Sequence, residues 1–176
     1  MMRFTNWYVI TGAPCSGKTT SIRDLEQRGY RVVHEVARAY IENEIKKGKS
    51  MVRIKADKLA FERHILYKKA EIEASLPENL IIFFDRAVPD SIAYFKLEGL
   101  NSDEPLKISR NVRYKKIFLF ERLSFARDDA RSENDAQAAS LECLIRNSYQ
   151  TLGYDIVRVP LLSVKQRTEF ILQHLQ

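Results

Sequence analysis

The sequence contains few of the residues on which small cross-linked proteins depend. Of its 176 residues, only two are cysteine, three histidine, five proline and six glycine. Two cysteines cannot form a disulfide framework, and Cys15, Cys143 and the scattered histidines lack the spacing of a zinc site. We therefore expect no structural metal. A chain of this length can bury a core without such help, so we expect a single domain over residues 1–176.

Long apolar runs are missing as well. No window reaches the ~18 to 20 consecutive apolar residues that a membrane-spanning helix needs. The apolar stretch Trp7–Ile10 is too short to be the hydrophobic region of a signal peptide. The sequence therefore predicts a cytoplasmic protein without a membrane span.

Positive charge is in modest excess, with 29 Lys and Arg against 23 Asp and Glu and a net charge of +6. Such a balance suits both phosphate-bearing small molecules and nucleic acids. The lysines are spread along the chain and no nucleic-acid-binding motif accompanies them. Nucleic acid is therefore the weaker of the two expectations.

Short β-prone runs alternate with helical patterns, which predicts an α/β fold with a mostly parallel sheet. The five expected strands cover residues 7–11, 30–34, 80–84, 117–120 and 155–159. The expected helices cover residues 19–28, 35–47, 54–75, 89–98, 137–152 and the stretch after Ser163, which caps the last of them. The strands at 80–84 and 117–120 are apolar throughout, as is typical of strands covered on both faces.

A phosphate-binding motif joins the first strand to the first helix. Residues 12–19 match G-x-x-x-x-G-K-[ST], the P-loop or Walker A pattern, at every fixed position. The expected nucleotide-binding residues are Gly12, Ala13, Pro14, Cys15, Ser16, Gly17, Lys18, Thr19 and Thr20. The backbone of such a loop wraps around a polyphosphate, so side chains must be absent where it approaches closely. A chance glycine-rich turn is the alternative, but the preceding strand and the following helix supply the context that the motif requires.

Three side chains complete the expected site for ATP and Mg²⁺. Lys18 can reach the β- and γ-phosphates, and the hydroxyl of Thr19 can bind Mg²⁺. Asp85 follows the strand at 80–84, where P-loop proteins place a second group for the metal. The alternative for Asp85 is a cap on the turn that follows the strand.

The residue after Asp85 bears on the reaction. Many hydrolytic P-loop machines place a Glu there to polarise water, whereas this chain has Arg86. An Arg stays protonated and cannot act as a base, but it can bind a phosphate or a carboxylate. Arg86 therefore favours phosphoryl transfer to a bound acceptor over hydrolysis by a motor ATPase.

Three segments together resemble a known family of small P-loop proteins. They are the P-loop, the segment Glu35–Arg38 and the run Asp85–Tyr94. This family is labelled as AAA-domain or predicted ATPase/kinase proteins, and it is similar to the ribosylnicotinamide kinase domain of NadR. More distantly it resembles thymidylate and deoxynucleoside kinases. The resemblance covers nearly the whole chain and implies a three-layer P-loop NTPase sandwich, nucleoside/nucleotide-kinase-like, with a five-stranded parallel sheet in the order 2-3-1-4-5. Cys15 departs from the pattern, since many relatives carry Gly there.

The resemblance also implies an acceptor side. Glu35 corresponds to a carboxylate that takes the proton of the acceptor hydroxyl, and Arg38 to a residue that positions the acceptor. A carboxylate base suits the phosphorylation of a hydroxyl. Two alternatives stay open: Glu35 could only cap its helix, where an anion is favoured anyway, and Asp85 could be the base instead.

The charged segment at 121–135 corresponds to a lid in the resembling kinases. Arg122, Arg127 and Arg131 lie in it, and Arg127 and Arg131 are spaced to share one helix face. Guanidinium groups that close on the triphosphate would stabilise the charge of the transition state. The alternative is a solvated charged helix.

Two functions remain open from the sequence. The first is a kinase that transfers the γ-phosphoryl group of ATP to an unidentified small-molecule acceptor resembling a nucleoside, a nucleotide or a cofactor. The second is a nucleotide-binding regulator, an ATPase or GTPase switch that hydrolyses NTP without such an acceptor. The chain lacks the N-K-x-D motif with which GTPases read guanine, which favours ATP.

Overall fold

A computed structural model of the chain describes residues 2–121 and 132–175. Residues 122–131, which include Arg122, Arg127 and Arg131 of the predicted lid, lie outside the described residues. No helix in the described part is long and apolar enough to cross a membrane.

The core of the molecule is a five-stranded parallel sheet. Its strands are β2 (Trp7–Thr11), β3 (Arg31–Val33), β4 (Ile82–Asp85), β6 (Lys116–Phe120) and β7 (Ile156–Val159). They lie side by side in the order β3-β4-β2-β6-β7. Counted along the chain, this is the order 2-3-1-4-5, so the predicted fold class and topology are confirmed. The register sets Ile10 opposite Asp85, which brings the start of the P-loop beside the end of β4.

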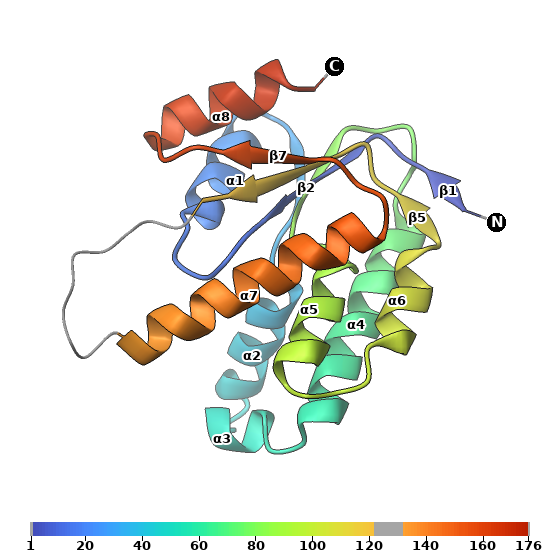
Figure 1. Cartoon of the computed structure of the whole chain (residues 1–176), viewed down its shortest axis with the longest axis vertical. Helices are drawn as coiled ribbons and strands as arrows, with labels where there is room; N and C mark the ends of the chain where they lie inside the picture. Colours follow the sequence, from blue (N-terminus) through green and yellow to red (C-terminus); the bar gives the residue numbers. More distant parts are fainter. Residues whose placement is uncertain (1, 122–131, 176) are drawn as a thin grey trace.

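Helices cover both faces of the sheet (Figure 1). Helices α1 (Lys18–Gln27) and α8 (Val164–Gln173) pack on one face, and α5 (Asp90–Leu97) and α7 (Ser132–Thr151) on the other. The central strand serves both layers because successive side chains point to opposite faces. Trp7 and Val9 belong to the cluster with α5 and α7, whereas Tyr8 and Ile10 belong to the cluster with α1 and α8.

Four further helices lie beside the sheet. They are α2 (Val36–Lys46), α3 (Met51–Ile54), α4 (Lys58–Ser75) and α6 (Asp103–Ser109). Two short strands, β1 (Arg3–Phe4) and β5 (Val112–Arg113), pair in parallel as a separate small sheet. The sequence predicted neither these strands nor α6, since a two-residue strand is too short to show a periodic pattern.

Two predicted boundaries are wrong for local reasons. The helix expected at 54–75 begins only at Lys58, as α4, because the Asp57 side chain accepts a hydrogen bond from the Ala60 amide at 2.9 Å and caps the helix there. Ile54 is the last residue of the separate short helix α3, which was not predicted. The strand expected at 80–84 starts at Ile82, where pairing with β2 begins. Leu80 and Ile81 precede that register and are 43% and 41% exposed.

The end of the predicted lid segment is helical as well. Helix α7 begins at Ser132, so residues 132–135 belong to a helix that was expected to start at 137. Helix α8 begins as predicted, and Ser163 caps it through a capping box with Gln166.

Candidate active site

The P-loop leaves β2 and enters α1 through three residues with left-handed backbone angles. The φ angles are 139° at Gly12, 59° at Cys15 and 83° at Gly17. A side chain at Gly12 would place its Cβ 2.8 Å from the backbone oxygen of Phe120, so the neighbouring strand alone requires glycine there. Cys15 is an exposed non-glycine residue in the left-handed region. A glycine would adopt this conformation without strain.

A side chain from α8 supports the loop from behind. Nη1 of the buried Arg167 donates a hydrogen bond to the Ser16 carbonyl at 2.9 Å, and its guanidinium lies 5.6 Å over the Phe120 ring. A Cβ on Gly17 would meet the same guanidinium at 2.3 Å. In a trans peptide the C=O and the following N–H point in opposite directions. Arg167 therefore turns the Gly17 N–H away from α8, toward the side of the loop where phosphates would bind.

Lys18 is buried in the loop that it closes. Its Nζ donates to the Ala13 carbonyl at 2.7 Å and to Ser16 Oγ at 3.1 Å. Burial, together with the positive charge of Arg86, lowers the pKa of Lys18 from 10.5 to about 7. Next along the chain Thr19 is half-buried, while the exposed Thr20 donates its hydroxyl to the Gly17 carbonyl at 2.8 Å.

Asp85 ends β4 as a buried carboxylate. Burial raises its pKa, and the negative charge of Glu35 adds to that shift. Its Oδ1 is buried and has no hydrogen-bond partner among the described residues, so the turn-capping alternative receives no support from this atom. An unsatisfied buried acceptor is unfavourable, and a hydrated cation would relieve it.

This geometry fits a magnesium ion that depends on its nucleotide. Within residues 2–121 and 132–175, no three His, Cys, Asp or Glu side chains gather into a metal cluster. Mg²⁺ in nucleotide sites commonly takes one or two protein oxygens and fills its remaining positions with phosphates and water. The Asp85 oxygen and the Thr19 hydroxyl are the two groups that would hold it.

Arg86 is fixed between two carboxylates. It is 4% exposed and has a φ of 65°, and its backbone N–H donates to the Ile10 carbonyl at 3.0 Å. Its Nε lies 3.4 Å from Glu35 Oε1, and its Nη1 lies 3.4 Å from Asp90 Oδ1. The guanidinium is thus oriented before any ligand binds.

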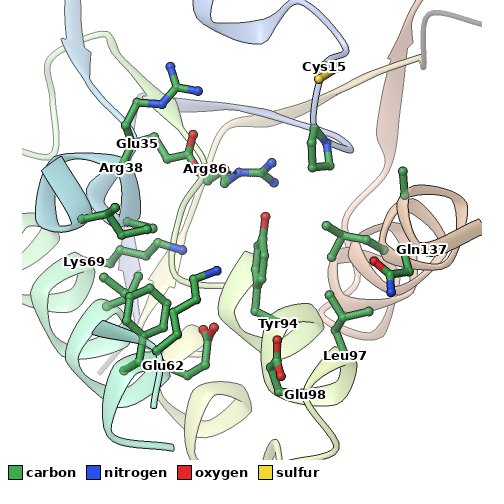
Figure 2. Close-up of a pocket in the computed structure, with 18 of the residues that line it drawn as sticks. Cys15, Glu35, Arg38, Glu62, Lys69, Arg86, Tyr94, Leu97, Glu98 and Gln137 are labelled. Atoms are coloured by element: carbon green, nitrogen blue, oxygen red, sulfur yellow. Dashed lines mark ion pairs between the residues drawn. The ribbon is translucent and has the colours of Figure 1, made fainter. Parts of the chain in front are cut away.

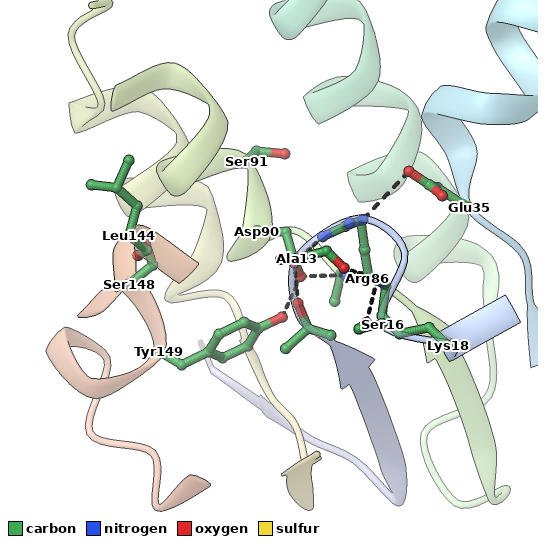
Figure 3. A network of polar contacts seen from close by, with 12 residues as sticks. Ala13, Ser16, Lys18, Glu35, Arg86, Asp90, Ser91, Leu144, Ser148 and Tyr149 are labelled. Carbon is green, nitrogen blue, oxygen red and sulfur yellow. Dashed lines mark hydrogen bonds and ion pairs between the residues drawn. The ribbon is translucent and has the colours of Figure 1, made fainter. Parts of the chain in front are cut away.

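Asp90 is the hub of this polar network (Figure 3). It is fully buried, and it accepts hydrogen bonds from the Tyr149 hydroxyl at 2.6 Å, from the Ala87 amide at 2.9 Å and from the Thr11 hydroxyl. These contacts join β2, the start of α5, and α7. Asp90 belongs to the run that resembles the family, but no local pattern indicates its partner Tyr149, which lies 59 residues away.

Glu35 points away from the helix that it precedes. It is the N-cap residue of α2, yet its side chain makes no capping hydrogen bond, so the geometry gives no support to the alternative of a helix cap. The carboxylate pairs with Arg86 instead. Glu35 and Arg38 both line one cavity, as expected for residues on the acceptor side.

That cavity has a volume of about 940 Å³ and lies between the P-loop and helices α2, α4, α5 and α7. Figure 2 shows Glu35, Arg86, Lys69 and Tyr94 facing the same space, with Cys15 at its edge. Among the residues that line it are Pro14, Cys15, Glu35, Arg38, Phe61, Glu62, Lys69, Arg86, Tyr94 and Gln137. Glu62 and Lys69 were not predicted as site residues, because charged residues on a long helix are usually solvated.

The sequence profile of a family described as AAA domain matches residues 7–167 of the chain. The chain belongs to this AAA domain family. No curated protein matches the chain in sequence.

Several solved structures share the fold of this chain. NadR in complex with NR is 18% identical with a TM-score of 0.71, covering 98% of this chain and 51% of NadR. Deoxyadenosine kinase from M. mycoides is 17% identical with a TM-score of 0.64, covering 96% and 97%. Thymidylate kinase from Ehrlichia chaffeensis is 14% identical with a TM-score of 0.61, covering 97% of each chain. The AAA domain thus spans about half the length of the NadR chain, and these likenesses establish its fold.

Proposed function

We propose that this AAA domain is a kinase that transfers the γ-phosphoryl group of ATP to a hydroxyl of a small nucleoside-, nucleotide- or cofactor-like acceptor. One observation carries the proposal: the P-loop opens onto a cavity of about 940 Å³, and Pro14 and Cys15 form part of its wall. A nucleotide held by the loop and a small molecule in the cavity would therefore meet. The kinase names of the structural neighbours agree with this chemistry.

On the ATP side, the backbone of Gly12–Thr19 would bind the phosphates, and Lys18 would reach the β- and γ-oxygens. Thr19 and Asp85 would hold Mg²⁺, which supplies positive charge against the β- and γ-oxygens. Carried over from the resemblance, Arg127 and Arg131 are proposed to close on the triphosphate.

On the acceptor side, the geometry supports Glu35 over Asp85 as the base. Glu35 lines the cavity and its side chain is 22% exposed, whereas Asp85 is buried behind the loop and is not among the cavity-lining residues. Arg86, held 3.4 Å from Glu35, would orient that carboxylate and present a positive charge to the transferring group. Asp85 is then left free for the metal.

The test is ATP turnover in the presence of nucleosides, nucleotides and cofactor precursors. We expect one compound to stimulate turnover and to appear as its phosphorylated product. Glu35→Gln should lower that rate by about 10²-fold or more, the usual contribution of a positioned base. Glu42→Gln is the matched control, since Glu42 lies on α2 and lines the same cavity. Slow turnover that no compound changes would favour the regulatory switch instead.

A further inference from the structure

Lys69 is a buried cation without an anionic partner. It lies on α4, is 5% exposed and lines the acceptor cavity. Within the described part of the chain, its one hydrogen-bond partner is Ser91 Oγ at 3.3 Å. No carboxylate among those residues comes within ion-pair distance of its Nζ. Burial lowers the pKa of Lys69, as expected for an ammonium removed from water.

The other buried cations of the site differ from Lys69. Arg86 pairs with Glu35 and Asp90, and Lys18 donates to two oxygens of its own loop. An ammonium offers three donors, so one contact with a neutral hydroxyl leaves most of the capacity of Lys69 unused. Because an unpaired buried charge is unfavourable, such an arrangement indicates a missing anion.

The acidic residues around the cavity do not supply that anion. Glu35 is paired with Arg86, and Glu98 with Lys58 at 2.7 Å. Glu62 lies about two turns before Lys69 on the same helix, yet the two side chains form no ion pair. Burial raises the pKa of Glu62.

The direction of the side chain agrees with a role toward a ligand. Figure 2 shows the ammonium of Lys69 pointing into the cavity, on the side of α4, with the Tyr94 hydroxyl between it and the P-loop. Glu35 and Arg86 face the same space from α2 and the end of β4. The cavity therefore offers one end suited to a hydroxyl and another end suited to an anion.

We propose that Lys69 forms an anion-binding subsite within the acceptor cavity, and that the acceptor carries a phosphate or a carboxylate besides the hydroxyl that is phosphorylated. The inference rests on the proposed function and narrows it. Neutral nucleosides become poor acceptors, and molecules such as nucleoside monophosphates or sugar-linked carboxylates become good ones.

Binding to the wild-type protein tests the subsite without any variant. Calorimetry with Mg²⁺ and a non-hydrolysable ATP analogue would compare neutral and anionic members of matched pairs. Thymidine with its 5′-monophosphate and deoxyadenosine with its 5′-monophosphate test a phosphate. Adenosine with its 5′-carboxylate analogue tests a carboxylate. We expect the anionic member of at least one pair to bind about tenfold tighter, as a charge-assisted hydrogen bond implies. The proposal is overturned when no anionic member binds better than its neutral counterpart.

A pair of variants on adjacent residues assigns the effect to one side chain. Lys69→Met should weaken binding of the preferred anion by about tenfold and leave its neutral counterpart unchanged. Lys68→Met is the matched control, because Lys68 is an exposed neighbour on α4 that pairs with Glu71. If Lys69 served only packing, Lys69→Met would lower the melting temperature and spare the anion. We expect the melting temperature to hold or rise, since Met fills the same volume without a charge.

The outcomes separate this inference from the function on which it rests. If anions bind through Lys69 but no bound compound is phosphorylated, the anion subsite is supported and the proposed kinase activity is contradicted. Transfer to neutral acceptors, with no preference for anions, would sustain the kinase and reject the subsite. Affinity for the ATP analogue should be the same in wild type and Lys69→Met in either case.

Discussion

Lys18 shows how a single residue links nucleotide binding to pH. In the free protein, burial and the nearby Arg86 hold its pKa at about 7, so much of it is neutral at pH 8. Triphosphate oxygens beside Nζ would raise that pKa, because an opposite charge favours the ammonium. We therefore expect ATP binding at pH 8 to take up a proton.

Calorimetry in two buffers of different ionisation enthalpy measures this uptake. Because Lys18 is already protonated in the free protein at pH 6, the uptake should shrink there, and affinity should fall as the pH rises above 7. Equal uptake at both pH values would assign the proton to another group. Lys18→Ala should abolish nucleotide binding.

Individual residues differ in how far the sequence could reveal them. Gly12, Lys18 and Thr19 follow a local spacing, so their motif can be read without knowing the fold. Asp90 and Arg167 act through partners 59 and 151 residues away, which no local pattern encodes. The roles of Asp85 and Glu35 stay predictions, although the structure adds an unpaired oxygen to the first and an ion pair to the second.

At the scale of elements, α8 supports a loop from the other end of the chain. Arg167→Met removes the hydrogen bond to the Ser16 carbonyl. We expect the affinity for ATP to fall about tenfold, since one backbone donor of the phosphate site loses its fixed orientation. Calorimetry on folded protein measures the loss.

Two further variants on α8 separate positioning from packing. Lys165→Met, at an exposed position of the same helix, should bind ATP like wild type. Arg167→Lys keeps one donor and should recover part of the affinity. A lower melting temperature with unchanged affinity would reduce Arg167 to a packing residue.

Helix α4 is joined to its neighbours by a buried acid that makes stability depend on pH. Glu73 Oε1 accepts from the Tyr114 hydroxyl at 2.7 Å and from the Val88 amide at 3.1 Å. Burial is the largest effect on the pKa of Glu73 and raises it from 4.5 to about 7. The two hydrogen bonds and the charges of Lys69 and Arg3 act in the opposite direction. Because the folded state then holds a proton that the unfolded chain has lost, Glu73 makes the fold less stable as pH rises from about 4.5 to about 7.

Glu73→Gln keeps the accepting oxygen and removes the titration. Relative to wild type, its free energy of unfolding should increase as the pH rises from about 4.5 to about 7, by up to about 3 kcal/mol at pH 7. Urea unfolding at several pH values measures the difference. Glu71→Gln, on the exposed side of α4, should show no such trend, and parallel pH profiles for wild type and Glu73→Gln would contradict the prediction.

The elements were predicted best where they are long and buried. The five core strands follow from apolar runs and turn residues, and the resemblance supplied their order. The start of α4 was predicted too early and α3 was missed, because the cap at Asp57 interrupts a pattern that otherwise indicates a continuous helix. Strands β1 and β5 were missed because each has two residues and depends on the other.

For the molecule as a whole, we propose that the described parts unfold as one unit and that ATP stabilises them together. Trp7, the only tryptophan, is fully buried in the sheet, so its fluorescence reports on the core. Fluorescence and circular dichroism should give one coincident transition. With Mg²⁺, ATP at 100 times its dissociation constant should add about 2.7 kcal/mol. Two separate transitions would show that the chain has more than one folding unit.

The contact between Arg167 and the P-loop has a consequence during synthesis on the ribosome. The loop emerges early, but the side chain that orients its Ser16–Gly17 peptide is translated 151 residues later. At about 5 to 20 residues per second, that interval is on the order of ten seconds. The glycine-rich loop of a nascent chain is therefore synthesised well before it can bind a nucleotide tightly. ATP stabilises only a polypeptide whose distant helix has already docked.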